Sequence, residues 1–295
     1  MNPTRTNGHQ QETVQVGGAT RTFTLVRPGS PTEQAPVVLV FHGSKQDAAK
    51  FRVFTAGTFD RWAQEAGAIV AYLDGYKGHW NDARVSTSFA ARTDGVDDVA
   101  FARATLDLLV RRYNGDGSAV YVVGFSNGGQ MVIRLVHEMP AVLAGAAILS
   151  ATQPVPENFA PNAAQNQPLP VLLIHGTKDP LVPYAGGMAS MWGFRPRGLG
   201  LSAQETAAYY ASRNGITTAP TTTPVEAAEA GRTKVERTDY REQGHQPVTL
   251  YTVHGGGHTI PGPKRAPRIL GRTAQNFRAA DLISDFFGLT SRVSG

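Results

Sequence analysis

Five continuous apolar runs give the chain its main pattern. They span residues 36–41, 67–72, 119–123, 170–174 and 248–253. Runs of this length are typical of central parallel strands that are covered on both faces. Ahead of them, residues 13–16 and 21–26 alternate between polar and apolar side chains around a Gly-Gly pair, which predicts an antiparallel hairpin.

Segments with helical periodicity lie between these runs. Apolar residues recur at three- to four-residue spacing over residues 59–64, 96–113, 130–138 and 274–287. Asp97 and Asp98 open the second segment, where acidic side chains suit a helix N-terminus. Strands that alternate with helices predict an α/β fold with a doubly wound, mostly parallel sheet.

The regular alternation stops between residues 185 and 246. A Gly/Arg/Pro loop, a helix-like stretch over 202–213 and a Thr/Pro/Ala/Glu-rich stretch follow one another there. We interpret 185–246 as a cap or insertion before the final strands, and we expect it to influence what the protein binds. Residues 1–12 are polar and predict a disordered arm, which leaves 13–290 as a single domain.

Composition narrows the classes of function. The 295 residues are enough for one large domain with a buried core. The net charge of +5 is spread along the chain, except for a local concentration of cations between residues 264 and 278. We interpret that concentration as a solvated surface and expect no nucleic-acid partner; the alternative is a surface that binds an acidic polymer or nucleic acid. The chain has no cysteine, which excludes disulfides, thiolate catalysis and cysteine metal sites.

Neither a membrane partner nor a cofactor is expected. No apolar run reaches transmembrane length, and the first residues have no signal-peptide core. The sequence as it stands therefore predicts a cytoplasmic location, or a secreted one if a signal peptide has been removed. The histidines form no helical metal pair, and phosphate-loop and dinucleotide-loop patterns are absent, so we expect no metal and no cofactor. The oligomeric state is not predicted.

A glycine-bracketed serine carries the clearest chemical signal. Gly124-Phe125-Ser126-Asn127-Gly128 directly follows an apolar run, and helix-like sequence begins at Gln130. This is the strand–turn–helix context of the G-x-S-x-G nucleophile elbow. The turn is so tight that side chains two residues before and after the serine would collide. Glycines there predict that the Ser126 hydroxyl is exposed at the tip of the turn.

Two later runs end in residues that complete a catalytic set. Asp179 follows the run 170–174, and His258 follows the run 248–253 through a glycine loop. The order Ser, Asp, His is that of an α/β-hydrolase, with His258 as the base and Asp179 orienting it. His254 is a rival for the base. His175 is interpreted as a support for its loop.

Acyl transfer also needs donors for a tetrahedral oxyanion. We assign them to the backbone N–H groups of Asn127 and Ser44, the latter just after the first apolar run. Loss of one such donor typically costs about 3 kcal/mol in the transition state. His42 is interpreted as structural. Trp80 and Trp192 are candidate substrate contacts, with core packing as the alternative for each.

Several motifs together resemble one family. His42-Gly43, Trp80-Asn81 and the segments 96–101, 124–129, 175–184 and 255–262 resemble the polyhydroxybutyrate depolymerase and feruloyl/acetyl xylan esterase (LpqC-like) group of α/β-hydrolases. The resemblance implies an α/β-hydrolase fold, ester hydrolysis, and Ser126, Asp179 and His258 as the triad. Family members often carry a tryptophan where Ile260 stands, which makes Ile260 a third candidate substrate contact.

The motifs and the resemblance predict a serine carboxylester hydrolase that works through an acyl-enzyme on Ser126. Departures from the family pattern, including the absence of cysteine, favour a small or medium-sized ester of feruloyl, acetyl or hydroxyalkanoate-oligomer type over a crystalline polymer. Two alternatives stay open. One is an acyltransferase or biosynthetic cyclase with the same triad, and the other is a non-catalytic binding protein on the same scaffold.

Overall fold

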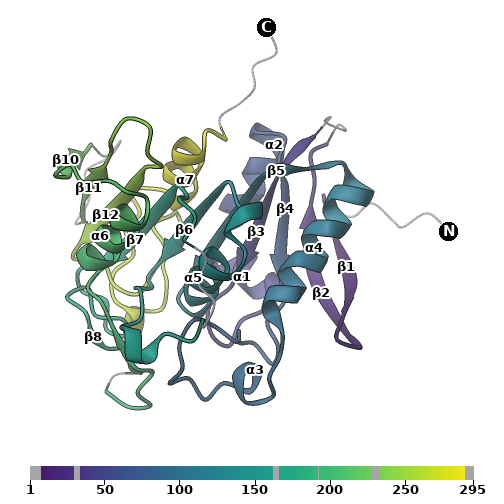
Figure 1. Cartoon of the computed structure of the whole chain (residues 1–295), viewed down its shortest axis with the longest axis horizontal. Coiled ribbons are helices and arrows are strands. Elements are labelled where there is room, and N and C mark those ends of the chain that lie inside the picture. Colours follow the sequence, from purple (N-terminus) through teal and green to yellow (C-terminus); the bar gives the residue numbers. More distant parts are fainter. Residues whose placement is uncertain (1–7, 30–33, 162–165, 192, 227–232, 290–295) are drawn as a thin grey trace, which may run out of the picture.

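A ten-stranded sheet forms the centre of the molecule (Figure 1). The computed structural model describes residues 8–29, 34–161, 166–191, 193–226 and 233–289. The strands of the sheet, in spatial order, are β1 (His9–Val16), β2 (Ala19–Val26), β4 (Ile69–Leu73), β3 (Ala35–Phe41), β5 (Gly115–Phe125), β6 (Gly145–Leu149), β7 (Val171–Gly176), β12 (Val248–His254), β11 (Lys234–Tyr240) and β10 (Thr221–Val225).

The central strands are parallel and the edges are antiparallel. Strands β4, β3, β5, β6, β7 and β12 pair in parallel. Strands β1 and β2 at one edge, and β11 and β10 at the other, are antiparallel. All five apolar runs lie in the parallel core, so the predicted doubly wound, mostly parallel sheet is confirmed.

Helices cover both faces of the sheet, and β3 shows how the sequence directs this. Val37, Leu39 and Phe41 point to one hydrophobic cluster, while Val38 and Val40 point to the other. The first cluster includes residues of α4 (Asp98–Tyr113), α5 (Asn127–Glu138) and α6 (Ala203–Arg213). The second includes residues of α1 (Ala48–Phe54), α2 (Arg61–Glu65) and α7 (Ala279–Phe287). Figure 1 shows these layers around the strands.

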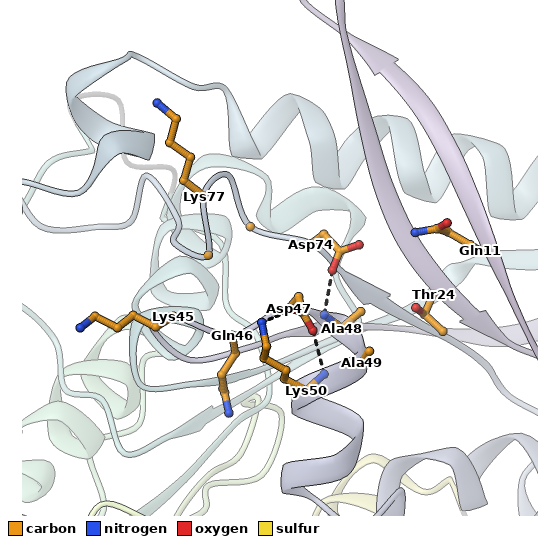
Figure 2. A pocket seen from close by; sticks show the side chains of 12 residues that line it. Gln11, Thr24, Lys45, Gln46, Asp47, Ala48, Ala49, Lys50, Asp74 and Lys77 are labelled. Atoms are coloured by element: carbon orange, nitrogen blue, oxygen red, sulfur yellow. Dashed lines mark hydrogen bonds and ion pairs between the residues drawn. The ribbon is translucent and has the colours of Figure 1, made fainter.

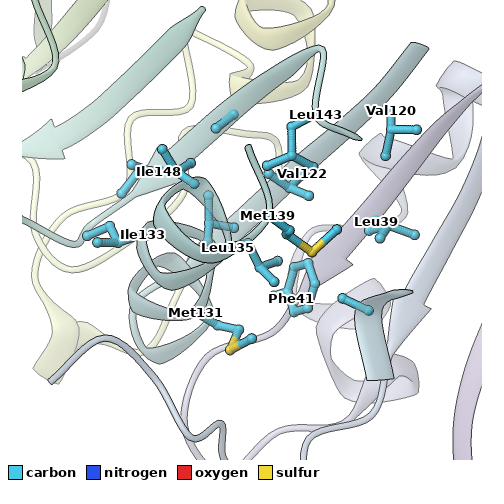
Figure 3. Packing of buried hydrophobic residues seen from close by; sticks show 14 of the residues in the cluster. Leu39, Phe41, Val120, Val122, Met131, Ile133, Leu135, Met139, Leu143 and Ile148 are labelled. Atoms are coloured by element: carbon cyan, nitrogen blue, oxygen red, sulfur yellow. The ribbon is translucent and has the colours of Figure 1, made fainter. Parts of the chain in front are cut away.

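Helix α5 is anchored firmly against the middle of the sheet (Figure 3). Its Met131, Ile133 and Leu135 are fully buried in the same cluster as Leu39 and Ile148. Full burial of each such side chain contributes about 1.5–3 kcal/mol. This packing fixes the position of the N-terminus of α5, which directly follows Ser126.

The helix ends follow local signals. The Asp97 carboxylate accepts the Ala100 N–H at 2.8 Å and caps α4, which ends at Asn114 in the left-handed region. Ser202 and Glu205 form a capping box at the start of α6. Helix α7 begins at Ala279, later than the predicted residue 274, because no regular helical turn forms over 274–278.

Two organisational predictions need correction. Strand β1 begins at His9, where it pairs with Val26, so residues 9–12 of the predicted disordered arm are part of the sheet. The segment 185–246 is only partly a cap. Its strands β10 and β11 extend the main sheet, and α6 packs against β7 and β12. Within its described residues, the short hairpin of β8 (Gly187–Met188) and β9 (Leu199–Gly200) forms a separate two-stranded sheet.

Candidate active site

Ser126 occupies a strained turn between β5 and α5. Its backbone has φ 56° and ψ −115°, in a region that side-chain-bearing residues rarely adopt. A Cβ on Gly124 would lie 2.1 Å from the Gly128 carbonyl oxygen, and one on Gly128 would lie 2.1 Å from the Phe41 carbonyl oxygen. The predicted steric reason for the first glycine is thus confirmed. The second glycine is required by the close approach of β3.

The structure brings the three predicted residues into one line. The Ser126 Oγ lies 2.8 Å from His258 Nε2, and His258 Nδ1 lies 2.7 Å from Asp179 Oδ2. His258 is 3% exposed and Asp179 is 8% exposed. With Nδ1–H donating to the carboxylate, Nε2 is free to accept the serine hydroxyl proton. The arrangement can activate an oxygen nucleophile.

Glycines and backbone hydrogen bonds hold the loop that carries His258. The His258 N–H donates to the Leu270 carbonyl at 2.7 Å, and the Gly257 N–H donates to the Arg272 carbonyl at 2.9 Å. A Cβ on Gly257 would lie 2.1 Å from the Leu270 carbonyl oxygen. The ring of Phe125 packs on the imidazole, with 5.0 Å between centroids. The imidazole is therefore positioned by main chain and by the residue before Ser126.

Asp179 is held as a carboxylate. Its Oδ1 accepts the backbone N–H groups of Leu181 and Val182 at 2.8 and 2.9 Å. Burial by itself would raise the pKa of Asp179, but His258 and these hydrogen bonds outweigh it, so the pKa lies below its ordinary value. His175 Nε2 lies 2.9 Å from the Val182 carbonyl oxygen, which places this histidine as a support of the loop.

The other two histidines considered from the sequence lie in different settings. His254 is exposed and forms an ion pair with Glu236 at 2.8 Å on the neighbouring strand β11. His42 is buried, with Nδ1 donating to the Gly43 carbonyl and Nε2 accepting the Gly75 N–H at 2.9 Å. Burial lowers the pKa of His42 to about 4. His42 is therefore a neutral residue that ties two loops together.

Two backbone donors remain available beside Ser126. In the loop after β3, the Gly43 N–H donates to Gln46 Oε1 at 2.9 Å and the Lys45 N–H to the Gly78 carbonyl at 2.8 Å. Within the described part of the chain, the Ser44 N–H has no acceptor. Asn127 is the first residue of α5, where a helix leaves N–H groups unpaired. These are the two predicted oxyanion donors.

The side chain of Asn127 is locked by a buried charged pair that sequence reasoning missed. Its Nδ2 donates to Asp82 Oδ2 at 2.6 Å, and its Oδ1 accepts the Trp80 N–H at 3.0 Å. Asp82 also binds Arg84 at 2.5 Å, and both side chains are buried. The spacing Asp82-x-Arg84 beside the Trp-Asn motif is the signal that could have suggested this pair.

Of the three predicted substrate contacts, two are buried in the core and one lies outside the described residues. Trp80 is fully buried, its Nε1–H donates to the His42 carbonyl at 2.9 Å, and its ring packs against Phe41. It therefore supports the loop after β3 and presents no surface to a substrate, which corrects the prediction. Ile260 is 6% exposed within the second hydrophobic cluster, so it too is mainly a packing residue. Trp192 lies outside the described residues.

A separate groove of about 620 Å³ lies beside the loop after β3 (Figure 2). Its two central carboxylates are occupied, since Asp74 accepts the Ala48 N–H and Asp47 accepts the Lys50 N–H. Lys45 and Lys77 point away from them. None of the three residues of the Ser126 line is among its lining residues, so we assign it no part in the chemistry.

The described residues contain neither a metal-binding cluster nor a membrane-spanning helix. Among the described residues, no three His, Cys, Asp or Glu side chains gather closely enough to hold a metal ion. No helix in the described ranges is both long and apolar enough to cross a membrane.

Comparisons with known proteins agree with this geometry. Residues 100–191 match the family model described as phospholipase/carboxylesterase. The chain is 34% identical over 285 residues to the putative esterase NocK of Nocardia uniformis subsp. tsuyamanensis, covering 92% of this chain and 80% of that protein.

A second sequence relative and a solved structure are also similar to the chain. Feruloyl esterase B of Piromyces equi is 27% identical over 230 residues, covering 76% of this chain and 39% of that protein. The acetyl xylan esterase from Aspergillus awamori superimposes with a TM-score of 0.63 at 15% identity, covering 95% of this chain and all of that one. At that identity the superposition speaks for the fold alone, which is that of an α/β-hydrolase.

Proposed function

Because the chain belongs to the polyhydroxybutyrate depolymerase and feruloyl/acetyl xylan esterase group of α/β-hydrolases, a group of carboxylic ester hydrolases, we propose that it cleaves a soluble ester through an acyl-enzyme on Ser126. The observation that carries this proposal is the unbroken hydrogen-bonded line from Ser126 through His258 to Asp179. Each contact is of hydrogen-bond length, and the line ends on a buried carboxylate.

The first half of the reaction forms the acyl-enzyme. His258 Nε2 takes the proton of the Ser126 hydroxyl as its oxygen attacks the ester carbonyl carbon. The negative charge that develops on the carbonyl oxygen is stabilised by the N–H groups of Ser44 and Asn127. When the tetrahedral intermediate collapses, the ester C–O bond breaks and His258 gives its proton to the departing alcohol.

The second half returns the enzyme to its starting state. His258 removes a proton from water, whose oxygen attacks the acyl carbon of the Ser126 ester. The second tetrahedral intermediate releases the carboxylic acid, and Ser126 recovers its proton from His258. Throughout, Asp179 keeps the imidazole in the tautomer with Nδ1 protonated and stabilises its cation.

The substrate class is proposed from the family and from the accessible site. The relatives by sequence that are named as feruloyl and acetylxylan esterases suggest hydroxycinnamoyl and acetyl esters as the first compounds to assay. A small or medium-sized ester, hydroxyalkanoate oligomers included, suits a nucleophile that sits at a turn and is neither deeply buried nor fully exposed.

Substitution of Ser126 tests the proposal. Ser126→Ala should lower kcat/KM for p-nitrophenyl butyrate by about 10⁴-fold or more, since the nucleophile is lost. Ser118→Ala, at an exposed position of the same strand, is the matched control and should behave as wild type. Undiminished turnover by Ser126→Ala would refute the acyl-enzyme.

Product analysis separates hydrolysis from acyl transfer. With an added alcohol such as glycerol, the free acid should remain the main product because water attacks the acyl-enzyme. A predominance of the glycerol ester would instead assign the protein to the acyltransferases.

A further inference from the structure

Three side chains from distant segments form a stack, which we call the rim stack: His79, Phe89 and Arg197. The rings of His79 and Phe89 lie 4.1 Å apart with an interplanar angle of 22°. The Arg197 guanidinium carbon lies 4.9 Å from the centre of the Phe89 ring. All three residues are partly exposed, so the stack offers a surface to solvent or to a ligand.

The rim stack adjoins the site of chemistry. His79 precedes Trp80, whose backbone N–H donates to Asn127 Oδ1, and Asn127 follows Ser126. Arg197 belongs to the β8–β9 hairpin, where its N–H donates to the Ala189 carbonyl at 2.8 Å. Figure 1 shows α3 (Ala90–Thr93), just after Phe89, and β8 at the same end of the molecule.

The guanidinium of Arg197 lacks an anionic partner. Within the described ranges it makes no hydrogen bond and no ion pair. Asp82 attracts it electrostatically, but that carboxylate already binds Arg84 and Asn127. Burial, followed by the charge of Arg84, lowers the pKa of Arg197 to about 10, so the group stays cationic at neutral pH. An anion that binds a partly desolvated cation of this kind stabilises it.

Two loops that adjoin the proposed site residues along the chain carry further exposed cations. The loop that follows His258 exposes Lys264, Arg265 and Arg268, and Lys45 is exposed next to Ser44. Of these, Lys264 donates to the Val53 carbonyl and Arg265 to Gln275, so their charges are not neutralised by those contacts. Exposed cations of this kind raise the local concentration of anionic ligands at the protein surface.

We propose, building on the esterase function proposed above, that Arg197 binds a carboxylate carried by the substrate, so that the preferred esters are anionic. The Arg197 guanidinium lies over the Phe89 ring, and within the described ranges its N–H groups make no hydrogen bond. The planar N–H edge of a guanidinium matches a carboxylate with two parallel hydrogen bonds. An ester of a dicarboxylic acid, or a short hydroxy-acid oligomer with a free carboxyl end, has this chemistry.

The test compares pairs of esters in which one member carries a free carboxylate and the other does not. We would measure kcat/KM for mono-p-nitrophenyl glutarate and p-nitrophenyl pentanoate, and for a 3-hydroxybutyrate dimer and its methyl ester. The two pairs place the carboxylate on the acyl side and on the alcohol side. The wild type should prefer the anionic member of at least one pair by about 10- to 100-fold, and added salt should reduce that preference.

Variants assign the preference to Arg197. Arg197→Gln should lose the preference and keep its rate on the neutral ester, while Arg197→Lys should keep part of it. Arg195→Gln removes an exposed arginine of the same hairpin and should behave as wild type. Thermal unfolding of each variant shows whether the hairpin remains folded.

Three results would overturn the inference. One is a wild type without any preference for the anionic esters. Another is an Arg197→Gln variant that loses activity on charged and neutral esters alike, which would make Arg197 structural. If the wild type turned over neither member of any pair, the proposed function would fail and this inference with it.

Discussion

The proposed catalytic centre, which we call the centre, and the rim stack are built in opposite ways. His258 and Asp179 are buried, and each is fixed by backbone groups at the ends of central strands. The rim stack is half-exposed, comes from loops, and includes a cation without an anionic partner among the described residues. The centre is complete without a ligand, whereas the rim gains a partner only when one binds.

This difference suggests that the centre determines the reaction and that the rim stack determines which esters are preferred. The geometry of the centre depends on β5, β7 and β12, which the whole hydrophobic core holds in place. A change there should affect every ester in the same proportion. The rim depends on a few contacts between loops, so a change there should affect some esters and spare others.

The largest effect should come from the base. His258→Gln should lower kcat/KM by about 10⁴-fold or more on all esters, because no group remains to accept the Ser126 proton. His254→Gln replaces the exposed histidine on the same strand end and should leave the rate unchanged. Steady-state kinetics on p-nitrophenyl butyrate decide this. An inactive His254→Gln beside an active His258→Gln would reverse the assignment.

A smaller effect on the rate is expected from the buried Asp82–Arg84 pair, which holds Asn127. Asp82→Asn leaves the buried Arg84 unpaired and should lower the free energy of unfolding by about 3–5 kcal/mol. It should also lower kcat more than it raises KM, since Asn127 loses the partner that orients it.

The control for Asp82 is an exposed pair of the same kind. Asp94→Asn, which removes the surface partner of Lys77, should change the free energy of unfolding by no more than about 1 kcal/mol. Urea unfolding measures both variants. Equal losses for the two would show that the Asp82 pair does not support the centre.

The smallest effect for a single residue is a pH dependence of stability. Burial lowers the pKa of His42 and that of His137 to about 4, against about 6.5 in an unfolded chain. The unfolded state therefore binds protons first as the pH falls. The stabilisation is complete above about pH 6.5 and is lost toward pH 4, on the order of 2 kcal/mol per histidine between pH 7 and 5.

Urea unfolding at the two pH values measures this loss. His137→Gln cannot titrate at that position and should show a smaller loss than wild type. A wild type equally stable at pH 7 and pH 5 would contradict the burial of these histidines. Asp179 should not contribute over this range, because its lowered pKa keeps it ionised.

The sequence predicted the centre well because its signals are local. Apolar runs locate the strands, and the residues at their ends meet at one edge of a parallel sheet. Gly124 marks the elbow through a steric contact within five residues of the chain. Strand β6 was not predicted because three of its five residues are glycine or alanine, which weakens the apolar pattern.

Features that depend on distant contacts could not be predicted. A tryptophan beside a polar motif suits either a core or a binding surface, and the choice for Trp80 is made by Phe41 and His42. Strands β10 and β11 are polar because they lie at an edge, so they appeared to belong to an insertion. Arg197 becomes a candidate binding residue only through its contact with Phe89, which lies more than a hundred residues earlier in the chain.

The central claim is that Ser126 is the nucleophile, and covalent trapping tests it most directly. The protein would be treated with a fluorophosphonate and digested, and the modified residue located by mass spectrometry. We expect a single adduct on Ser126, loss of esterase activity in step with labelling, and no adduct in Ser126→Ala. A labelled residue other than Ser126, or full activity after Ser126 has been labelled, would contradict it.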